Sequence, residues 1–486
     1  MPTLTRVRDS HAALAHAVSP GAWRRSFAMR PADAIFAPAI KVGIAASLVL
    51  VSGGLLGQGQ LAGIASLGAL VSAFGRYQPY PRLGRMLLLV AGCLLLAAGA
   101  GSLMGAAGVP PWYQIAVFSV LAGLAAHVFG AFGVTGPGAV ILVFAASAGS
   151  GYAHTADAVP RVLAAVALGA GAGWIVAMAP VLVEPMGPAR LAVARAIAAV
   201  VQLGTDDAGT RLGDAASPLR RARESVALSA GRQRSGELRA VRLQREAASL
   251  HGLLDEAEAA LSLAGEARAA ALGRLARHES ALRRTWRTAP TPGTTAGGPA
   301  VGAPAAGAGA ARPAPEGFLA AARAGLGSWA SAGWAVRMAA ASALAGWAAV
   351  GLGLGHPLWA SMGAVAALQG LDYSTTVQRS IQRLLGNVAG AALAVALLSV
   401  PLGFWPSVAL VVAFQVLAEL LVLKNYTLTT IAVTPMALLM TGLGSHLGPE
   451  AAFSRVADTL AGVVAGVLVA AVSISRTDRA HVAPEG

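Results

Sequence analysis

Long apolar runs, separated by short polar stretches, occupy most of the chain in two sets of six. The first set covers about residues 34–56, 58–74, 86–107, 113–132, 134–152 and 160–182. The second set covers about residues 334–354, 356–371, 383–400, 404–423, 427–444 and 455–473. A helix needs roughly 20 apolar residues to cross the hydrocarbon core of a bilayer. The pattern therefore predicts an all-α polytopic membrane protein with twelve transmembrane helices.

The residues between the two sets have a different character. Region 184–288 is rich in arginine and in acidic residues, and its leucines recur at helical spacing, as in Leu243/Leu250 and Leu254/Leu261. This periodicity predicts a cytoplasmic region of amphipathic helices that pack on each other. Residues 289–316 consist mainly of Pro, Gly and Ala, which offer little side chain to bury, so they are predicted to form a disordered linker.

These patterns divide the chain into six predicted parts. They are a basic, amphipathic, cytoplasmic N-terminal segment (1–33), a first six-helix transmembrane repeat (34–183), the cytoplasmic helical region (184–288), the linker (289–316), a second six-helix transmembrane repeat (317–474) and a cytoplasmic tail (475–486).

The two sets of apolar runs look duplicated. Residues 65–69 (ASLGA) match 360–364 (ASMGA), and 90–92 (VAG) match 388–390. Three further matches occur in the same order, namely 135–137 (TGP) with 433–435 (VTP), Arg161-Val162 with Arg455-Val456, and Lys41 with Arg337. An even number of spans in each unit makes both enter the membrane in the same direction. The sequence thus predicts parallel repeats about an axis along the membrane normal, with any substrate path near their interface.

Composition and charge support the membrane assignment. Hydrophobic residues make up 56% of the chain and charged residues 12%, which is atypical of a soluble enzyme. The net charge is +14, and with the N-terminus inside, 32 of the 36 basic residues fall on the cytoplasmic side. This fits the positive-inside rule, so the charge is no indication of nucleic-acid binding. We expect an inner-membrane protein with both termini in the cytoplasm.

Several kinds of chemistry are absent from the sequence. Neither lysine, Lys41 or Lys424, lies in an ATP-binding G-x-x-x-x-G-K-[ST] loop, and no G-x-S-x-G nucleophile motif occurs. No His, Cys or acidic residues have the spacing of metal ligands. The sequence predicts neither an ATP-driven pump nor an enzyme, and no cofactor.

Two prolines lie at corresponding places in the apolar runs. Pro137, close to Thr135, and Pro435 are predicted to interrupt the fifth and eleventh spans. A proline in a membrane helix frees a backbone carbonyl, and paired interruptions in two repeats point to a binding site. The alternative is a simple packing kink.

Hydroxyl groups also follow the eleventh span at helical spacing. The stripe is formed by Thr427, Thr430, Thr434 and Thr441. It either lines a polar path, the interpretation favoured because of Pro435, or its hydroxyls bond back to their own helix.

Few charged side chains lie in or beside the spans. Arg379 and Arg383 are four residues apart on one predicted helix face, where two guanidinium groups can bind a carboxylate, although each can also simply anchor the inner end of a span. Glu419 and Asp458 are candidates for proton coupling. Local ion pairs, with Lys424 and with Arg455 respectively, are the alternative.

The second half carries motifs of a known family. They are His356-Pro357-x-Trp359-Ala360, Asp372, Arg379, Gln382-Arg383-x-x-Gly386, Lys424-Asn425-Tyr426 and Arg455-x-x-Asp458-x-x-x-Gly462. With them, most of 334–473 resembles the fusaric acid resistance protein-like (FUSC) family of the aromatic acid exporter superfamily. The first half lacks the His-Pro-x-Trp opening and resembles the same unit weakly.

The resemblance implies six-helix repeats with cytoplasmic helical regions and export of aromatic carboxylates, and the related plant malate channels imply an anion path lined by basic residues. We expect a transporter that exports small organic anions. Its path would be formed by Arg379, Arg383, Lys424, Asn425, Tyr426, Thr430, Thr434, Pro435, Thr135 and Pro137.

Two alternatives to the exporter stay open. One is a passive anion channel, in which the current follows the electrochemical gradient without proton exchange. The other is a scaffold that does not transport and whose 184–288 region binds a partner. For the exporter, the partners that we consider besides the lipid bilayer and the substrate are further copies of the chain and an envelope adaptor protein.

Overall fold

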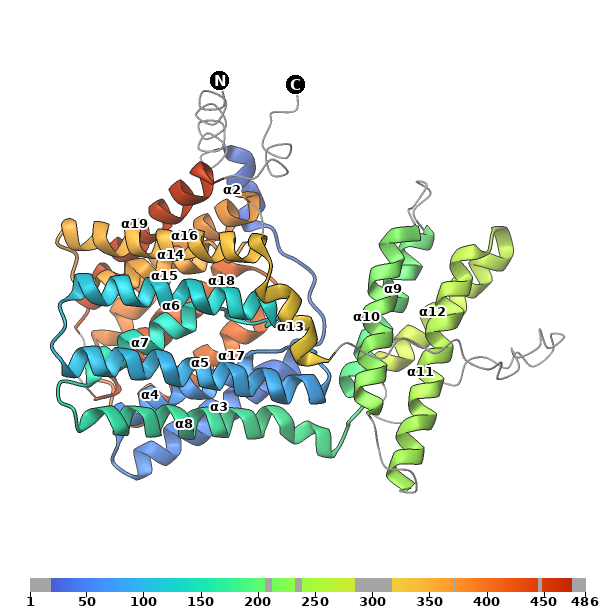
Figure 1. Cartoon of the computed structure of the whole chain (residues 1–486), viewed down its shortest axis with the longest axis horizontal. Helices are drawn as coiled ribbons and strands as arrows, with labels where there is room; N and C mark the ends of the chain where they lie inside the picture. Colours follow the sequence, from blue (N-terminus) through green and yellow to red (C-terminus); the bar gives the residue numbers. More distant parts are fainter. Residues whose placement is uncertain are drawn as a thin grey trace. The chain divides into compact units, whose positions relative to one another are not determined.

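The computed structural model of the chain describes residues 19–205, 212–231, 238–284, 317–370, 373–444 and 448–473. Every regular element within those ranges is an α-helix or a short 3-10 helix, which confirms the predicted all-α class (Figure 1). The predicted linker 289–316, the tail 475–486 and Asp372 lie outside the described residues.

The chain forms two compact units. The first, here called the membrane unit, comprises Met1–Arg76, Met86–Ala177 and Leu319–Gly486. The second, here called the helical unit, comprises Tyr77–Arg85 and Met178–Phe318.

A helix lies at each of the twelve predicted apolar runs. In the first half these are α3 (Phe36–Leu55), α4 (Gly59–Ala69) with η1 (Leu70–Ala73), α5 (Tyr80–Ala106), α6 (Pro111–Ala131), α7 (Val140–Tyr152) and α8 (Ala158–Met178) with η2 (Ala179–Leu182). In the second half they are α14 (Trp329–Gly351), α15 (Pro357–Ala367), α16 (Tyr373–Leu398), α17 (Phe404–Leu421), α18 (Tyr426–Thr441) with η3 (Gly442–Gly444), and α19 (Glu450–Val472). A short helix, α13 (Phe318–Leu326), precedes α14, and α2 (Pro20–Phe27) precedes α3.

Among the described residues, seven helices are long and apolar enough to cross a membrane, namely α3, α5, α6, α8, α16, α17 and α19. Four other apolar helices are shorter: α4 with η1, α7, α15 and α18. The chain is therefore a multi-pass membrane protein, but not all twelve predicted spans have the length of a full crossing.

The first helix of each half ends in the same way. Gly57 follows α3 and Gly353 follows α14, and both have left-handed backbones, with φ of 68° and 70°. After each glycine, a backbone N–H reaches back to a carbonyl five residues earlier, from Gln58 to Gly53 (2.8 Å) and from Leu354 to Ala349 (2.9 Å). These bonds are the helix-ending motif that favours glycine, since other residues rarely adopt a left-handed backbone.

Glycines also allow close contact between helices. A Cβ added to Gly169 of α8 would lie 1.8 Å from the Ala65 carbonyl oxygen of α4. In the second half, a Cβ on Gly462 of α19 would lie 2.4 Å from the Ala360 carbonyl oxygen of α15. Small residues of this kind let membrane helices pack backbone to backbone.

The helical unit has its own core. It contains α9 (Gly187–Thr205), α10 (Leu212–Ala230), α11 (Leu238–Ser262) and α12 (Gly265–Arg284). Leu243, Leu250 and Leu254, which set the predicted helical spacing, are buried in this core and Leu261 packs against it. The buried Arg190 forms ion pairs with Glu184 and Glu246. Partial burial nevertheless raises the pKa of the Glu184 carboxyl, although Arg190 acts in the opposite direction.

We expect Gly169→Ala to lower the free energy of unfolding by about 1–3 kcal/mol, because the added methyl group would overlap a carbonyl of α4. Gly171 of the same helix has no neighbour within 4 Å of a Cβ, so Gly171→Ala is the matched control and should be neutral or stabilising. Unfolding by SDS in mixed micelles, followed by circular dichroism, measures both variants. Equal midpoints for the two would contradict the packing argument.

Candidate functional site

Two predicted path arginines meet at one tyrosine. Tyr426 opens α18, where the side-chain oxygen of Asn425 caps the helix by accepting from the Thr427 N–H (2.8 Å). The Arg379 guanidinium lies over the Tyr426 ring, 4.3 Å from its centre. Arg383, one turn further along α16, donates to the Tyr426 hydroxyl (3.1 Å). The structure thus brings Arg379, Arg383 and Tyr426 together.

The close approach of α16 and α18 depends on a glycine of the family motif. A Cβ on Gly386 would lie 2.6 Å from the Thr427 carbonyl oxygen. A larger residue there would push α18 away from α16, and with it Tyr426 away from Arg383.

Arg455 of α19 joins this group. Its guanidinium lies over the Trp359 ring at 4.7 Å and interacts electrostatically with Arg383, Tyr426 and Asp458. Asp458 accepts a hydrogen bond from Ser454 (3.2 Å). We call Arg379, Arg383, Tyr426, Arg455 and Asp458 the arginine cluster.

The arginine cluster corrects the predicted place of Arg455. With the N-terminus inside, the ninth predicted span (383–400) begins at the inner surface and the twelfth (455–473) at the outer one, which would keep Arg383 and Arg455 apart. In the structure the two side chains interact electrostatically. Arg383 lies about 15 Å along α16 from its first residue, and Arg455 lies within α19 rather than at its end. Sequence reasoning therefore missed Arg455 as a partner of Arg383.

Positive charge is in excess in this buried cluster. Arg383 and Arg455 are only 8% and 6% exposed, and Asp458 is fully buried. The cluster thus contains three guanidinium groups and one carboxylate. The Nε atoms of both arginines and one Asp458 oxygen are buried without a hydrogen-bond partner among the described residues. Buried charges are normally paired, and guanidinium groups with unused donors bind carboxylates well. The arrangement fits an anion with carboxylate chemistry.

Asn387 links three helices beside the arginine cluster. On α16, its amide nitrogen donates to Thr459 of α19 (2.6 Å), and its oxygen lies 2.5 Å from the Thr434 hydroxyl of α18. All three side chains are 1% exposed. Sequence reasoning did not assign Asn387 a role. Its signal is a single amide in an otherwise apolar stretch of helix.

The motif residues His356 and Trp359 pack together rather than face a path. Their rings stack at 4.1 Å, and His356 Nδ1 lies 3.0 Å from the Ser454 hydroxyl of α19. Pro357 is the first residue of α15, a position where its missing N–H costs nothing. These residues fix α15 against α19.

The predicted pairing of Pro137 with Pro435 is wrong. Pro435 lies inside α18, whereas Pro137 precedes α7, which begins at Val140. The flanking Gly136 and Gly138 have φ of 146° and 77°, which a right-handed helix cannot contain. Pro137 is nevertheless linked to the arginine cluster through Gln369. The Gln369 amide nitrogen donates to the Pro137 carbonyl (2.8 Å), and its oxygen accepts from Arg379 (3.3 Å). Thr135 is exposed, and its carbonyl accepts from the Gly75 N–H (2.8 Å).

The threonine stripe shows the second of its two predicted arrangements at two of its four positions. The hydroxyls of Thr430 and Thr441 donate to the carbonyl four residues earlier, at 2.9 and 2.8 Å. The single hydroxyl hydrogen of Thr434 is directed to the closer Asn387 oxygen (2.5 Å), with the Thr430 carbonyl at 2.9 Å. Thr427 differs, since its buried hydroxyl has no partner among the described residues.

Glu419 has another partner than the predicted Lys424. It forms an ion pair with Arg76, in the loop after η1, and it also attracts Lys41 of α3. The reason is that α17 packs against α3, which turns this carboxylate toward the first half of the chain. Arg455 and Asp458 still interact electrostatically, but Arg455 also contacts the Trp359 ring and Asp458 accepts from Ser454.

Lys424 and Asn425 hold the N-terminal segment instead of joining the cluster. The Asn425 amide donates to the carbonyls of Ser26 (3.1 Å) and Ala28 (3.2 Å). The Lys424 carbonyl accepts from the Arg30 N–H (3.0 Å).

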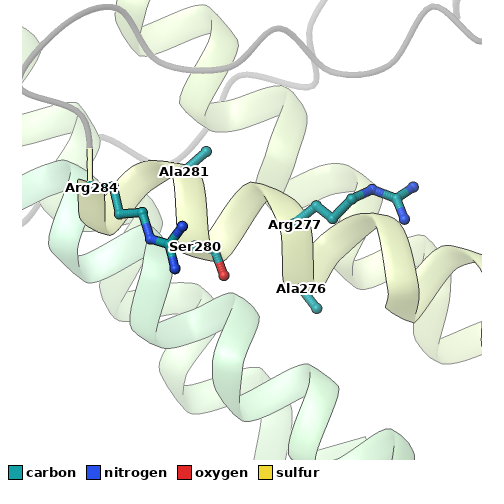
Figure 2. A pocket seen from close by; sticks show the side chains of 5 residues that line it. All are labelled: Ala276, Arg277, Ser280, Ala281 and Arg284. Atoms are coloured by element: carbon teal, nitrogen blue, oxygen red, sulfur yellow. The ribbon is translucent and has the colours of Figure 1, made fainter.

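Two hollows in the described structure lie elsewhere. One, of about 510 Å³, is lined by Gly54, Gly57, Gln58, Gly59, Gln60, Leu61, Tyr152, Phe404, Trp405 and Leu443. The other, of about 460 Å³, lies on α12 of the helical unit (Figure 2) and is lined by Ala276, Arg277, Ser280, Ala281 and Arg284. Neither includes a residue of the arginine cluster. Within the described ranges, no three His, Cys, Asp or Glu side chains lie close enough together to hold a metal ion.

Apolar crossing helices around a buried polar cluster define a polytopic α-helical membrane protein. Residues 340–469 match the family described as fusaric acid resistance protein-like, which confirms the family that the motifs indicate for this part of the chain. A stretch of 119 residues is 33% identical to the uncharacterised membrane protein YvaC of Bacillus subtilis. The matched stretch covers 24% of this chain and 19% of the length of that relative. No solved structure shows a significant match.

Thr434→Val should lower the free energy of unfolding by about 1–3 kcal/mol, because it leaves the buried Asn387 oxygen without its donor. Thr441→Val is the matched control. It removes a hydroxyl group that bonds only to the preceding turn, at an exposed site, and should change stability by less than about 0.5 kcal/mol. SDS unfolding in mixed micelles measures both. Equal losses would contradict a role for the Asn387 link.

Proposed function

We propose that the membrane unit transports organic anions across the membrane, with aromatic carboxylates as the substrate class and export as the direction. The observation that carries this proposal is the buried excess of positive charge in the arginine cluster. The match to the fusaric acid resistance protein-like family supports it independently.

The cluster offers an aromatic carboxylate two kinds of contact. The unused Nε–H groups of Arg383 and Arg455 can donate to its carboxylate. Arg379 can stack on an aromatic ring as it stacks on Tyr426 in the structure. Such an anion would also balance the positive charge that Asp458 alone leaves uncompensated.

The proposed architecture is two parallel six-helix repeats in the inner membrane, with both termini in the cytoplasm. Its support is the matching glycine contacts, in which Gly169 on Ala65 corresponds to Gly462 on Ala360. These contacts set an offset of 293 residues between α8 and α19. At that offset Val162, not Arg161, corresponds to Arg455, so the first half would lack the arginine cluster and the second half would bind the anion.

Asp458 is the proposed site of proton coupling, because it is the one carboxylate of the cluster. A carrier coupled through Asp458 needs a pH gradient for uphill export, whereas a passive channel follows the electrochemical gradient of the anion alone. Flux of labelled benzoate from proteoliposomes, with and without a pH gradient, separates the two. Flux that is independent of proton movement would contradict the coupling role.

Arg383→Gln should reduce benzoate flux in proteoliposomes by about ten- to a hundredfold, since it removes one charge-assisted contact worth about 1.5–3 kcal/mol. The control is Arg161→Gln, whose exposed guanidinium pairs with Asp157 outside the cluster and should leave flux unchanged. Elution of both variants as a single monodisperse peak shows that they are folded. Full flux through folded Arg383→Gln would refute the proposed site.

A further inference from the structure

The N-terminal segment Ser19–Arg30, which contains α2, is bound to the membrane unit by polar contacts. Helix α2 packs against α16, at the end of the membrane unit where the described chain begins (Figure 1). Amide side chains of α16 donate to its backbone, Gln378 to the Arg25 carbonyl and Gln382 to the Ser26 carbonyl, both at 2.9 Å. Asn425, before α18, donates to the Ser26 and Ala28 carbonyls.

Apolar contacts contribute little to this attachment. Within α2 only Ala22 and Ser26 are buried. The large apolar side chains of the segment stay accessible, with Trp23, Phe27 and Met29 exposed by 38%, 63% and 57%. A segment that is held by a few hydrogen bonds and buries little apolar surface opens more readily than the core of a domain.

The residues that hold the segment are sequence neighbours of the arginine cluster. Gln378 and Gln382 each precede a cluster arginine on α16, and Asn425 precedes Tyr426. Adjacent residues on the same helical turns therefore bind the segment and form the cluster. Ser26, whose carbonyl accepts from both Gln382 and Asn425, is completely buried at this point.

We propose that Ser19–Arg30 is a lid over the arginine cluster and that an anion reaches the cluster from this side only when the lid lifts. This proposal rests on the proposed function, because it assigns a regulation to the same site. In the closed state the amide N–H groups of Gln378, Gln382 and Asn425 donate to the carbonyl oxygens of Arg25, Ser26 and Ala28. Once the lid has lifted, the same amide N–H groups are free to donate to an incoming carboxylate, so the lid and the anion compete for them.

Neutral amides suit this exchange. A lysine or arginine in their place would hold an anion at the entrance by charge alone, whereas a neutral amide can donate either to a carbonyl or to a carboxylate.

Asn425→Asp tests the lid while sparing α18. The aspartate keeps an oxygen that accepts from the Thr427 N–H, so the helix stays capped. It loses the N–H group that holds the Ser26 and Ala28 carbonyls and sets a carboxylate against them. The double variant Gln378→Glu/Gln382→Glu removes the other two donors and is the second test, should Asn425→Asp fail to fold.

Access to the cluster is measured without relying on transport. Thr430, 3% exposed and one turn beyond Tyr426, is changed to Cys, and the one native cysteine, Cys93, is changed to Ser. The labelling rate of Thr430→Cys by the small, uncharged methyl methanethiosulfonate should rise by about tenfold in the lid variants. Gln114→Glu is the matched control, because it removes an amide-to-carbonyl bond of α6 (2.8 Å, to Val109) away from the lid and should leave the rate unchanged.

Each outcome is decisive. Faster labelling in the lid variants supports the lid. An unchanged labelling rate in folded lid variants overturns it. Faster labelling with no benzoate flux in any variant, the wild type included, supports the lid over the cluster and refutes the proposed substrate instead.

Discussion

Placing a guanidinium group away from water costs several kcal/mol unless a partner compensates its charge. The membrane unit buries Arg383 and Arg455 close to each other, with Asp458 as the carboxylate that opposes them. Several local contacts partly compensate the two buried positive charges. Tyr426 accepts from Arg383, and the Trp359 ring lies beneath Arg455. What these contacts leave uncompensated is positive charge, and this is why the site suits an anion.

The surrounding helices are held in place by contacts of two kinds. Glycines such as Gly386 and Gly462 let helices meet backbone to backbone, so that side chains on neighbouring helices come within hydrogen-bonding distance. Asn387 then links α16 to α18 and α19 through Thr434 and Thr459. In a bilayer, where burial of apolar surface does not drive helices together, close packing and interhelical hydrogen bonds take over that role.

Local patterns predicted much of the fold and part of the site. Apolar run length located the helices, and the leucine spacing located the core of the helical unit. The i, i+4 spacing of Arg379 and Arg383 placed both on one helix, and both do contact Tyr426. The prediction for Pro137 was wrong because the flanking Gly136 and Gly138 have positive φ angles, so α7 begins only after Pro137. A match between two three-residue sequences does not predict these backbone angles. Lys424 and Asn425 were assigned to the path, yet they hold the N-terminal segment, whose position no local pattern indicates.

The sequence by itself determined that the chain is all-α and multi-pass, since hydrophobic run length and helical periodicity are local properties that need no knowledge of neighbours. It also provided the family motif of the second half. Only the tertiary structure decided which charges meet. Glu419 pairs with Arg76 across more than 300 residues, and Arg455 joins Arg383 although the two lie on different helices. The physical reason is that a buried charge interacts with whatever helix packing brings beside it, and packing depends on contacts between segments that are far apart in the chain.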